Sequence, residues 1–292
     1  MKILVVTNLF PNPYQPDLAT FNRQQVLALS TEHDIRVIAP ISWAIEMRER
    51  KKQGVKLSGD RISDCDGLSI QHPRFVFTPK ILRGWYGHFY QKSIQNIFAR
   101  NVREFQPDLV FATWCYPDGW AAINLAREYD LPVVLKLHGS DIHDLPRPSL
   151  RFNRTLDALR GADAVVTVSR DMAQTVSSYG VTPEKIHTIY NGIDKQLFAR
   201  GSKTLARENL HFPSHDNLLL WVGRMVPVKG LDNLLKAVRI LSDEKLEVTV
   251  ALVGSGPLEP SLRQEAEALG ISAKIRFEGN ASHADLPDWY RA

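Results

Sequence analysis

The sequence is poor in cysteine and lacks long apolar runs. Its 292 residues include two cysteines, Cys65 and Cys115, in unlike surroundings and without CxxC spacing, so neither a disulfide framework nor a zinc site is supported. No stretch reaches the roughly 18 apolar residues of a membrane span, and the apolar run that ends at Thr7 is too short for the core of a signal peptide. We therefore expect a cytoplasmic protein in a reducing compartment.

An excess of one charge is also missing. The chain has 36 basic and 32 acidic residues and a net charge of +4, which is too small for the basic surface that nucleic-acid binding usually requires. The histidines show no metal-ligand spacing with one another or with the cysteines. We therefore predict neither a nucleic-acid partner nor a metal site.

Short β-branched runs bounded by turns recur along the first part of the chain, and they are typical of buried parallel strands. They cover Ile3–Thr7, Ile35–Ala39, Leu109–Thr113, Val133–His138, Ala164–Ser169 and Ile186–Tyr190. Segments of helical period separate most of them, including Phe21–Ser30, Trp120–Glu128 and Arg170–Tyr179. Such alternation predicts an α/β fold with a doubly wound parallel sheet.

A polar stretch, Ala199–Asn217, interrupts this pattern, and we place a hinge there between domains at residues 1–198 and 199–292. A second series follows, with strands at Leu218–Val222, Val248–Val253 and Ile275–Phe277 and helices at Leu231–Leu241, Leu258–Leu269 and Leu286–Ala292. A sheet of three strands is expected to leave an edge unpaired and half of its apolar face in water. The sequence therefore indicates an incomplete second domain.

The segment Trp221–Gly230 carries the strongest chemical signal, because it lies directly between a predicted strand and a predicted helix. Gly223 permits a tight turn, and a helix start offers free N–H groups with a partial positive charge. Arg224 and Lys229 add two cations at the same place, which predicts a diphosphate site. The alternative is a plain connection with two incidental surface cations.

Three further turns follow predicted strands. Gly254 and Gly256 would let a base or ribose approach the backbone, or they simply form a tight turn with Pro257 at the first helical position. His138 closes a strand of the first domain, where a neutral imidazole could donate to a sugar hydroxyl and Asp141 could orient the loop. Asn191 precedes Gly192 in a turn that also suits a hinge.

In this order and spacing, the segments resemble the retaining GT-B glycosyltransferases, a family that includes sucrose synthase-like, capsule and lipopolysaccharide enzymes. The matching segments are His138–Asp141, Val168–Met172, Tyr190–Asp194, Val222–Gly230 and Val253–Pro257. The resemblance implies two Rossmann-like lobes that face a cleft, with the acceptor on the first and the nucleotide-sugar donor on the second.

The resemblance also implies residue roles. Arg224 and Lys229 would hold the donor diphosphate and offset the charge of the leaving group, so that no metal or cofactor beyond the nucleotide sugar is needed. His138 would contact the transferred sugar. The remaining donor contacts would come from Gly223, Gly254, Gly256, Asn191 and Asp141. No side-chain nucleophile is implied, and the attack would occur on the face that the leaving phosphate occupies.

The sequence departs from the family pattern in two places, one near the acceptor and one near the donor. The loop Phe10–Phe21 lacks the glycine pair that family members often carry after the first strand, close to donor and acceptor. Within this loop, Asp17 and Thr20 are the residues that we expect to contact the acceptor. The Glu-x7-Glu segment that holds the donor ribose in the family is absent, so donor binding by this chain is expected to be weak.

The acceptor itself is predicted from a stretch of basic and aromatic residues between Lys80 and Arg103. Such a mixture can lie on an anionic membrane surface, which suggests a lipid-linked or polysaccharide acceptor at the inner face of the plasma membrane. The alternative is an amphipathic helix whose aromatic residues face the core.

Other functions remain as alternatives. A dinucleotide-dependent oxidoreductase would need GxGxxG after the first strand, and Thr7–Asn12 contains no glycine. A sugar-nucleotide epimerase or a phosphorylase shares the GT-B fold with different chemistry. A non-catalytic protein that binds sugar nucleotides or another protein is the alternative from a different class.

Overall fold

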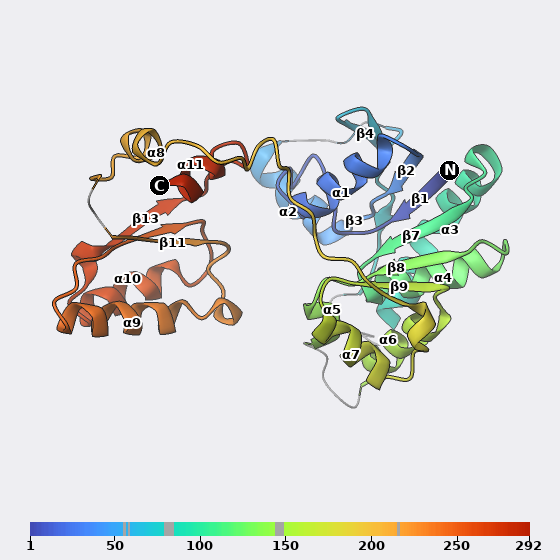
Figure 1. Cartoon of the computed structure of the whole chain (residues 1–292). Helices are drawn as coiled ribbons and strands as arrows, with labels where there is room; N and C mark the ends of the chain where they lie inside the picture. The colour runs from blue at the N-terminus through green and yellow to red at the C-terminus, as the bar shows by residue number, and fades with distance from the viewer. Residues whose placement is uncertain (55–56, 58, 79–84, 144–148, 215–216) are drawn as a thin grey trace. The chain divides into compact units, whose positions relative to one another are not determined.

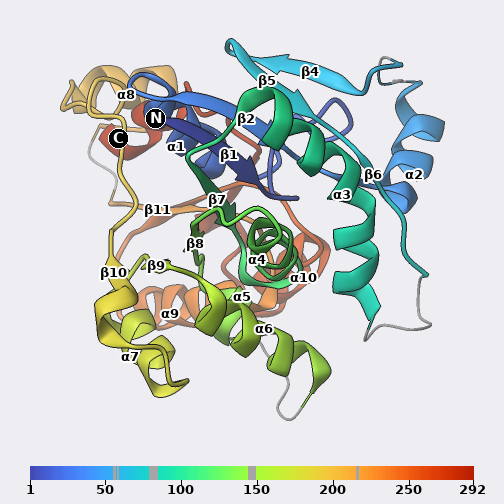
Figure 2. The same ribbon diagram turned by 90° about the vertical axis from the view of Figure 1, so that its right-hand side faces the viewer.

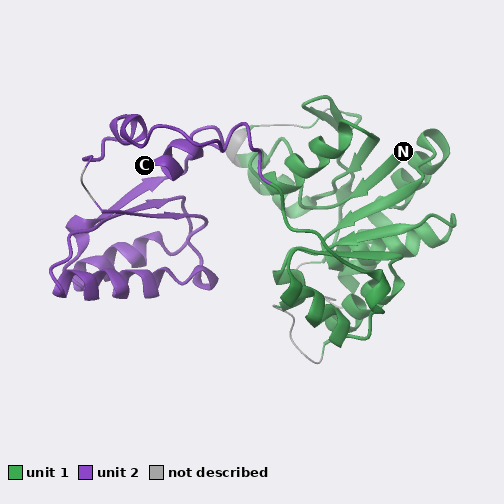
Figure 3. Cartoon of the chain, in the orientation of Figure 1, with its two compact units in different colours: residues 1–192 green, residues 193–292 purple. Residues whose placement is uncertain are grey.

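The computed structural model describes residues 1–54, 57, 59–78, 85–143, 149–214 and 217–292. The chain forms two compact units, Met1–Gly192 and Ile193–Ala292 (Figures 1 and 3). The sequence predicts the domain boundary six positions later, after residue 198, and that boundary stays a prediction.

The first unit contains an eight-stranded sheet in the order β10-β9-β8-β7-β1-β2-β5-β4. Its strands are β1 (Lys2–Val6), β2 (Asp34–Ile38), β4 (Ile62–Cys65), β5 (Leu68–Gln71), β7 (Leu109–Thr113), β8 (Val133–Lys136), β9 (Ala164–Thr167) and β10 (Ile186–Thr188). All pairs are parallel except β4 with β5. The short strands β3 (Ile41–Ser42) and β6 (Arg74–Phe75) form a separate parallel pair.

Helices cover both faces of this sheet, as alternate residues of β1 show. Leu4 and Val6 lie in one core cluster, whereas Ile3 and Val5 lie in another, as expected for a strand buried on both sides. The helices are α1 (Thr20–Ser30), α2 (Trp43–Gln53), α3 (Tyr86–Phe105), α4 (Trp120–Arg127), α5 (Ser140–His143), α6 (Leu150–Gly161) and α7 (Arg170–Ser178). The predicted doubly wound architecture is confirmed.

Helix α3 lies beside α4 (Figure 2) and uses the aromatic residues of the basic stretch mainly for packing. Tyr90, Ile94 and Phe98, spaced by four positions, are fully buried, and Tyr86 and Phe89 pack against the same core. Lys92, Arg100 and Arg103 are exposed on the opposite side, while Lys80 and Arg83 lie outside the described residues. The alternative of an amphipathic helix therefore accounts for most of this stretch.

The second unit has a three-stranded parallel sheet in the order β11-β12-β13. Its elements are β11 (Leu218–Val222), β12 (Thr249–Val253), β13 (Ile275–Gly279), α8 (Lys203–Asn209), α9 (Leu231–Asp243), α10 (Glu259–Ala268) and α11 (Leu286–Arg291). Val250 and Leu252 face α9 and α10, whereas Ala251 and Val253 pack with Phe212 and Trp289.

The expectation that half of this sheet's apolar face lies open to water is therefore wrong. The polar stretch Ala199–Asn217 contains α8, whose Arg207 is buried and donates hydrogen bonds to the carbonyl oxygens of Pro213 and Ser214 at 2.9 and 2.6 Å. These bonds fix the segment that carries Phe212. The stretch Ala199–Asn217 therefore covers one face of the sheet although its sequence shows no apolar alternation, because the charged side chain of Arg207 helps to hold it in place.

Candidate functional site

In the first unit, the loop after β8 places His138 next to a buried carboxylate. The backbone N–H groups of His138 and Gly139 donate to Asp141 Oδ1 at 3.0 and 2.8 Å, and the N–H of Cys115 donates to Oδ2 at 3.2 Å. Burial raises the pKa of Asp141, and these backbone bonds oppose the increase. Asp141 thus ties the loop after β7 to the loop after β8 and fixes the backbone of His138.

The imidazole of His138 lies between two aromatic rings. Its centroid is 5.0 Å from that of Phe21, at the start of α1, and 6.3 Å from that of Trp114, whose ring is nearly parallel to it. Burial, together with the nearby Lys136 ammonium, lowers the pKa of His138 to about 4, so the ring is neutral at neutral pH. Its Nε2 atom is buried and has no hydrogen-bond partner among the described residues.

The ammonium of Lys136 lies at the end of β8, and no motif in the sequence predicts a role for it. The side chain is buried, and Nζ donates to Gln25 Oε1 at 2.5 Å and to Asn191 Oδ1 at 3.0 Å. Burial lowers the pKa of Lys136. The structure therefore connects His138, Lys136 and Asn191 at the carboxyl edge of one sheet, although the amide oxygen of Asn191 is engaged by the lysine.

A second polar group at this edge is also absent from the sequence-based prediction. The hydroxyl of Thr113 donates to Thr7 Oγ1 at 2.7 Å and accepts from Asn22 Nδ2 at 3.1 Å. Beside it, Asp118 is fully buried and accepts from the hydroxyl of Tyr90 at 2.7 Å and from the N–H of Asn8. Burial raises the pKa of Asp118 to about 7.

The loop after β1 forms a cavity, but the predicted acceptor residues do not line it. The cavity measures about 190 Å³, and its lining combines aliphatic and aromatic side chains with a few amide and hydroxyl groups. Asn8, Asn12, Gln15, Ser42 and Tyr86 belong to this lining. Asp17 lies in an exposed turn and Thr20 begins α1, so their contact with an acceptor stays a prediction.

In the second unit, the predicted glycine positions allow two loops to pack against each other. A Cβ atom at Gly254 would lie 1.9 Å from the carbonyl oxygen of Gly223, and one at Gly256 would lie 2.4 Å from that of Met225. The N–H of Met225 also donates to Ser255 O at 3.0 Å. The glycines therefore serve loop–loop contact, and their contact with a donor stays a prediction.

Arg224 and Lys229 occupy the loop between β11 and α9, as predicted. Both side chains are exposed, and neither forms a hydrogen bond or ion pair with another described residue. Lys229 ends a short 3₁₀ turn, and Gly230, with φ of 62°, precedes α9 without a side-chain cap. The loop thus carries two exposed cations between the end of β11 and the uncapped start of a 13-residue helix, with Lys229 two positions before that helix.

Neither a metal centre nor a membrane span is found in the described residues. No group of three or more His, Cys, Asp and Glu side chains in that part of the chain could hold a metal ion. None of the helices described is long and apolar enough to cross a bilayer. The prediction that the reaction needs no metal stays a prediction.

The sequence is similar to curated glycosyltransferases. It is 31% identical over 186 residues to D-inositol 3-phosphate glycosyltransferase 1 of Catenulispora acidiphila, a match that covers 58% of this chain and 44% of that protein. It is 28% identical over 276 residues to the putative teichuronic acid biosynthesis glycosyltransferase TuaC of Bacillus subtilis, with 91% of this chain and 68% of that protein covered. The chain thus spans less than half of the first relative's length.

Solved structures share the fold. HepE of Anabaena, solved in complex with UDP and glucose, matches 99% of this chain and 71% of its own with a TM-score of 0.68 and 18% identity. A sucrose-phosphate synthase from Thermosynechococcus elongatus matches 99% of this chain and 73% of its own with a TM-score of 0.72 and 15% identity. UDP-GlcNAc 2-epimerase from Neisseria meningitidis, with 100% of this chain and 74% of its own covered, gives a TM-score of 0.57 at 13% identity.

Family models divide the chain in two. Residues 18–197 match Glycosyltransferase Family 4, and residues 202–292 match Glycosyl transferases group 1. The first match alone covers more than half of the 292 residues. The chain therefore belongs to Glycosyltransferase Family 4, with a second part that matches the group 1 model, and its fold is GT-B.

Proposed function

We propose that this protein transfers a sugar from a nucleotide sugar to a hydroxyl acceptor and retains the anomeric configuration. The observation that carries the proposal is the loop with Arg224 and Lys229. Its two exposed cations have no partner among the described residues, and an uncapped helix start follows them, which supports anion binding at this loop. A departing nucleoside diphosphate is the anion that this chemistry suits. The cations would stabilise its charge without a metal.

His138 is proposed to contact the transferred sugar. The neutral ring has a buried Nε2 without a partner among the described residues, and such an atom is costly unless a ligand or water satisfies it. A sugar hydroxyl can donate to or accept from that nitrogen, depending on the tautomer. Asp141 fixes the backbone at His138 and is proposed to position it.

The donor and the pathway are proposed from the relatives. HepE has been solved with UDP-glucose as well as with UDP, so UDP-sugars are the first donors to test. TuaC is named for teichuronic acid biosynthesis, which supports a role in cell-surface polysaccharide or glycolipid synthesis. A lipid-linked or polysaccharide acceptor would place the enzyme at the inner face of the plasma membrane, in contact with lipid through Lys92, Arg100 and Arg103.

The epimerase neighbour shows why the fold alone does not identify the reaction. A TM-score of 0.57 relates this chain to an enzyme named for different chemistry, so the choice of glycosyl transfer rests on the family models and the sequence relatives. The remaining candidate is a protein that binds sugar nucleotides without catalysis. Such a protein would bind UDP but would not cleave a UDP-sugar to release UDP.

The decisive experiment measures UDP binding by calorimetry and UDP release from UDP-sugars with candidate acceptors. Lys229→Ala is expected to lower kcat/KM by about 10²-fold or more, because a charged contact to the leaving group contributes roughly 2.7–4 kcal/mol. Lys236→Ala is the matched control, since Lys236 is an exposed lysine on α9 paired with Asp232. Equal rates for wild type and Lys229→Ala would remove Lys229 from its role, and UDP binding without release would favour the binding protein.

Retention and membrane contact have separate tests. NMR of the early product identifies its anomeric configuration, and an inverted product would contradict retention.

Sedimentation with liposomes, with and without anionic lipid, tests the contact through α3. Equal sedimentation in the two would contradict an electrostatic membrane contact.

A further inference from the structure

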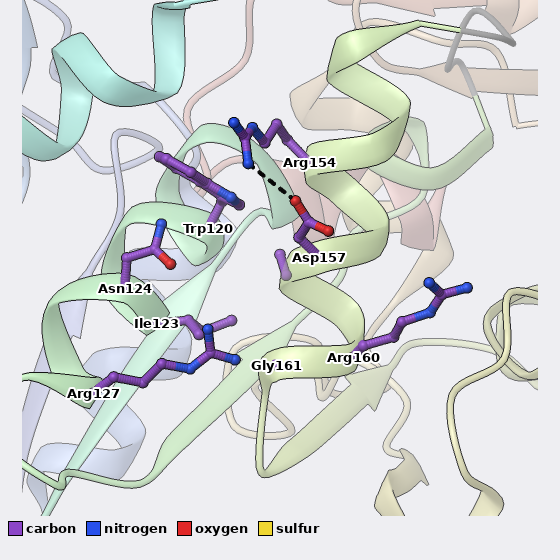
Figure 4. A pocket seen from close by; sticks show the side chains of 9 residues that line it. Trp120, Ile123, Asn124, Arg127, Arg154, Asp157, Arg160 and Gly161 are labelled. Atoms are coloured by element: carbon purple, nitrogen blue, oxygen red, sulfur yellow. Dashed lines mark hydrogen bonds and ion pairs between the residues drawn. The ribbon is translucent and has the colours of Figure 1, made fainter.

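A groove of about 360 Å³ lies between α4 and α6 in the first unit (Figure 4). Its lining includes Trp120, Asn124, Arg127, Arg154, Asp157 and Gly161. None of these residues belongs to the predicted donor or acceptor sites. We propose that this groove binds a small anionic sugar, meaning a phosphate or carboxylate carried on a hydroxylated ring. The proposal goes beyond glycosyl transfer and does not rest on it.

Arg127 supplies the first cation. It is exposed at the end of α4, and its side chain extends toward α6 (Figure 4). None of its guanidinium N–H groups donates to another described residue. Gly161 leaves the space for this head group, because a Cβ atom there would lie 2.5 Å from Arg127 Nη2. The guanidinium can therefore offer its donors to an oxyanion in the groove.

Arg154 supplies the second cation, in a fixed position. Its guanidinium lies 5.0 Å from the centroid of the Trp120 ring, and Nη1 donates to Asp157 Oδ2 at 3.2 Å. These two contacts hold the planar group while its other N–H groups stay available. Arg160, also in the lining, turns away (Figure 4) and donates to the carbonyl of Tyr179.

Asp157 and Asn124 explain why the ligand should carry hydroxyl groups. A carboxylate inside an anion site repels a bare anion, but it accepts hydrogen bonds from hydroxyls. The Asn124 side chain, whose Nδ2 also donates to Gln91 Oε1 at 3.5 Å, adds an amide with a second N–H and an acceptor oxygen. The groove therefore fits a ligand with an oxyanion near Arg127 and hydroxyls near Asp157 better than it fits inorganic phosphate. Its volume lies within the range of ordinary small-molecule sites, about 300–1,000 Å³.

Isothermal titration calorimetry with glucose 6-phosphate tests the site, and glucuronate in a second arm tells whether a carboxylate replaces the phosphate. The Lys229→Ala background is used throughout, so that the loop before α9 does not contribute. Arg127→Gln is expected to weaken binding at least tenfold. Gly161→Ala, whose Cβ would displace the end of the Arg127 side chain, is expected to weaken binding by a smaller factor. Arg50→Gln, which removes an exposed arginine of α2, is expected to leave it unchanged.

The site is supported if the parent protein binds saturably and both groove variants bind more weakly while they keep the melting temperature of the parent protein. Equal affinity of Arg127→Gln and the parent protein would overturn it, as would the absence of binding at millimolar glucose 6-phosphate and glucuronate. Inorganic phosphate that binds as tightly as glucose 6-phosphate would overturn the sugar-sized ligand. Since UDP release is not measured, the result is independent of the proposed transfer reaction.

Discussion

The Nζ atom of Lys136 lies 3.0 Å from the side-chain oxygen of Asn191, so a buried cation at the end of β8 holds the last residues of the first unit. Its other bond is to the amide oxygen of Gln25 at 2.5 Å. No described carboxylate forms an ion pair with this ammonium. The charge of Lys136 therefore acts on its surroundings with little compensation, and the neighbouring ring of His138 is the group that responds.

Replacing Lys136 by methionine should raise the pKa of His138 above about 4. The increase should stop below the ordinary value of 6.5, because burial is the larger cause of the shift and remains in the variant. An NMR titration of the imidazole resonances measures this value directly. Lys92→Met, which removes an exposed lysine of α3, is the control, and a His138 titration that is the same in all three proteins would contradict the prediction.

Asp118 should make the protein less stable as the pH rises from about 4 to about 7. Its pKa is raised from 3.8 to about 7 in the folded state, so the folded protein binds the extra proton within this range and the unfolded chain does not. The full effect is at most about 4 kcal/mol, since one pKa unit corresponds to about 1.4 kcal/mol. Above pH 7 the penalty of the buried charge is complete.

Urea unfolding of wild type and Asp118→Asn at several pH values measures this effect. The asparagine keeps an acceptor for Tyr90 and Asn8 but cannot ionise, so its advantage over wild type should grow with pH. Asp130→Asn serves as the control, because Asp130 is exposed and asparagine tolerates its φ of 52°. A constant difference between wild type and Asp118→Asn from pH 5 to pH 8 would refute the assignment.

Gly254→Ala should destabilise the second unit by about 2–4 kcal/mol, through overpacking and backbone strain together. The new Cβ would collide with the carbonyl oxygen of Gly223, a backbone atom that cannot rotate away. Gly279→Ala isolates the backbone strain, since φ there is 73° and a Cβ would meet no atom within 4 Å beyond its chain neighbours. Its cost should be about 1 kcal/mol. Hydrogen exchange of the amides in β12 measures the loss of stability in both variants. Equal losses in Gly254→Ala and Gly279→Ala would argue against the collision.

Apolar patterning predicts the parallel strands well, for a physical reason. Strands buried on both faces are continuous apolar runs rich in β-branched residues, so β1, β7, β9 and β12 are recognisable from sequence within one or two residues. The three-stranded sheet of the second unit is predicted for the same reason. Helix ends are predicted less accurately, because caps and frayed turns depend on local contacts.

The region between Ile41 and Phe75 escapes prediction because polar contacts hold it. Glu46 on α2 accepts hydrogen bonds from Arg61 and Arg74, with distances of 3.0–3.1 Å. Its pKa is lowered to about 2, mainly by the bond from Arg74. Strands β3 and β6 are two residues long, so they show no readable period.

The candidate site also contains residues that the sequence predicts and residues that it does not. Glycine spacing and a strand end identify the loops that carry Gly223, Gly254 and His138, because turns leave local signals in a sequence. Lys136 and Asp118 leave none, since each becomes special only through burial and partners far along the chain. A lysine at the end of an apolar run, as in Val133–Lys136, is the one feature that could point to a buried cation.

The contact between the loops after β11 and β12 has a mechanical consequence. With Gly254 against the oxygen of Gly223 and Gly256 against that of Met225, neither loop can shift outward or inward alone without opening a gap or a clash. A displacement of the Gly223 loop toward the Ser255 turn is therefore possible only if both turns move together. Sequence changes in either turn are constrained by its neighbour in the same way.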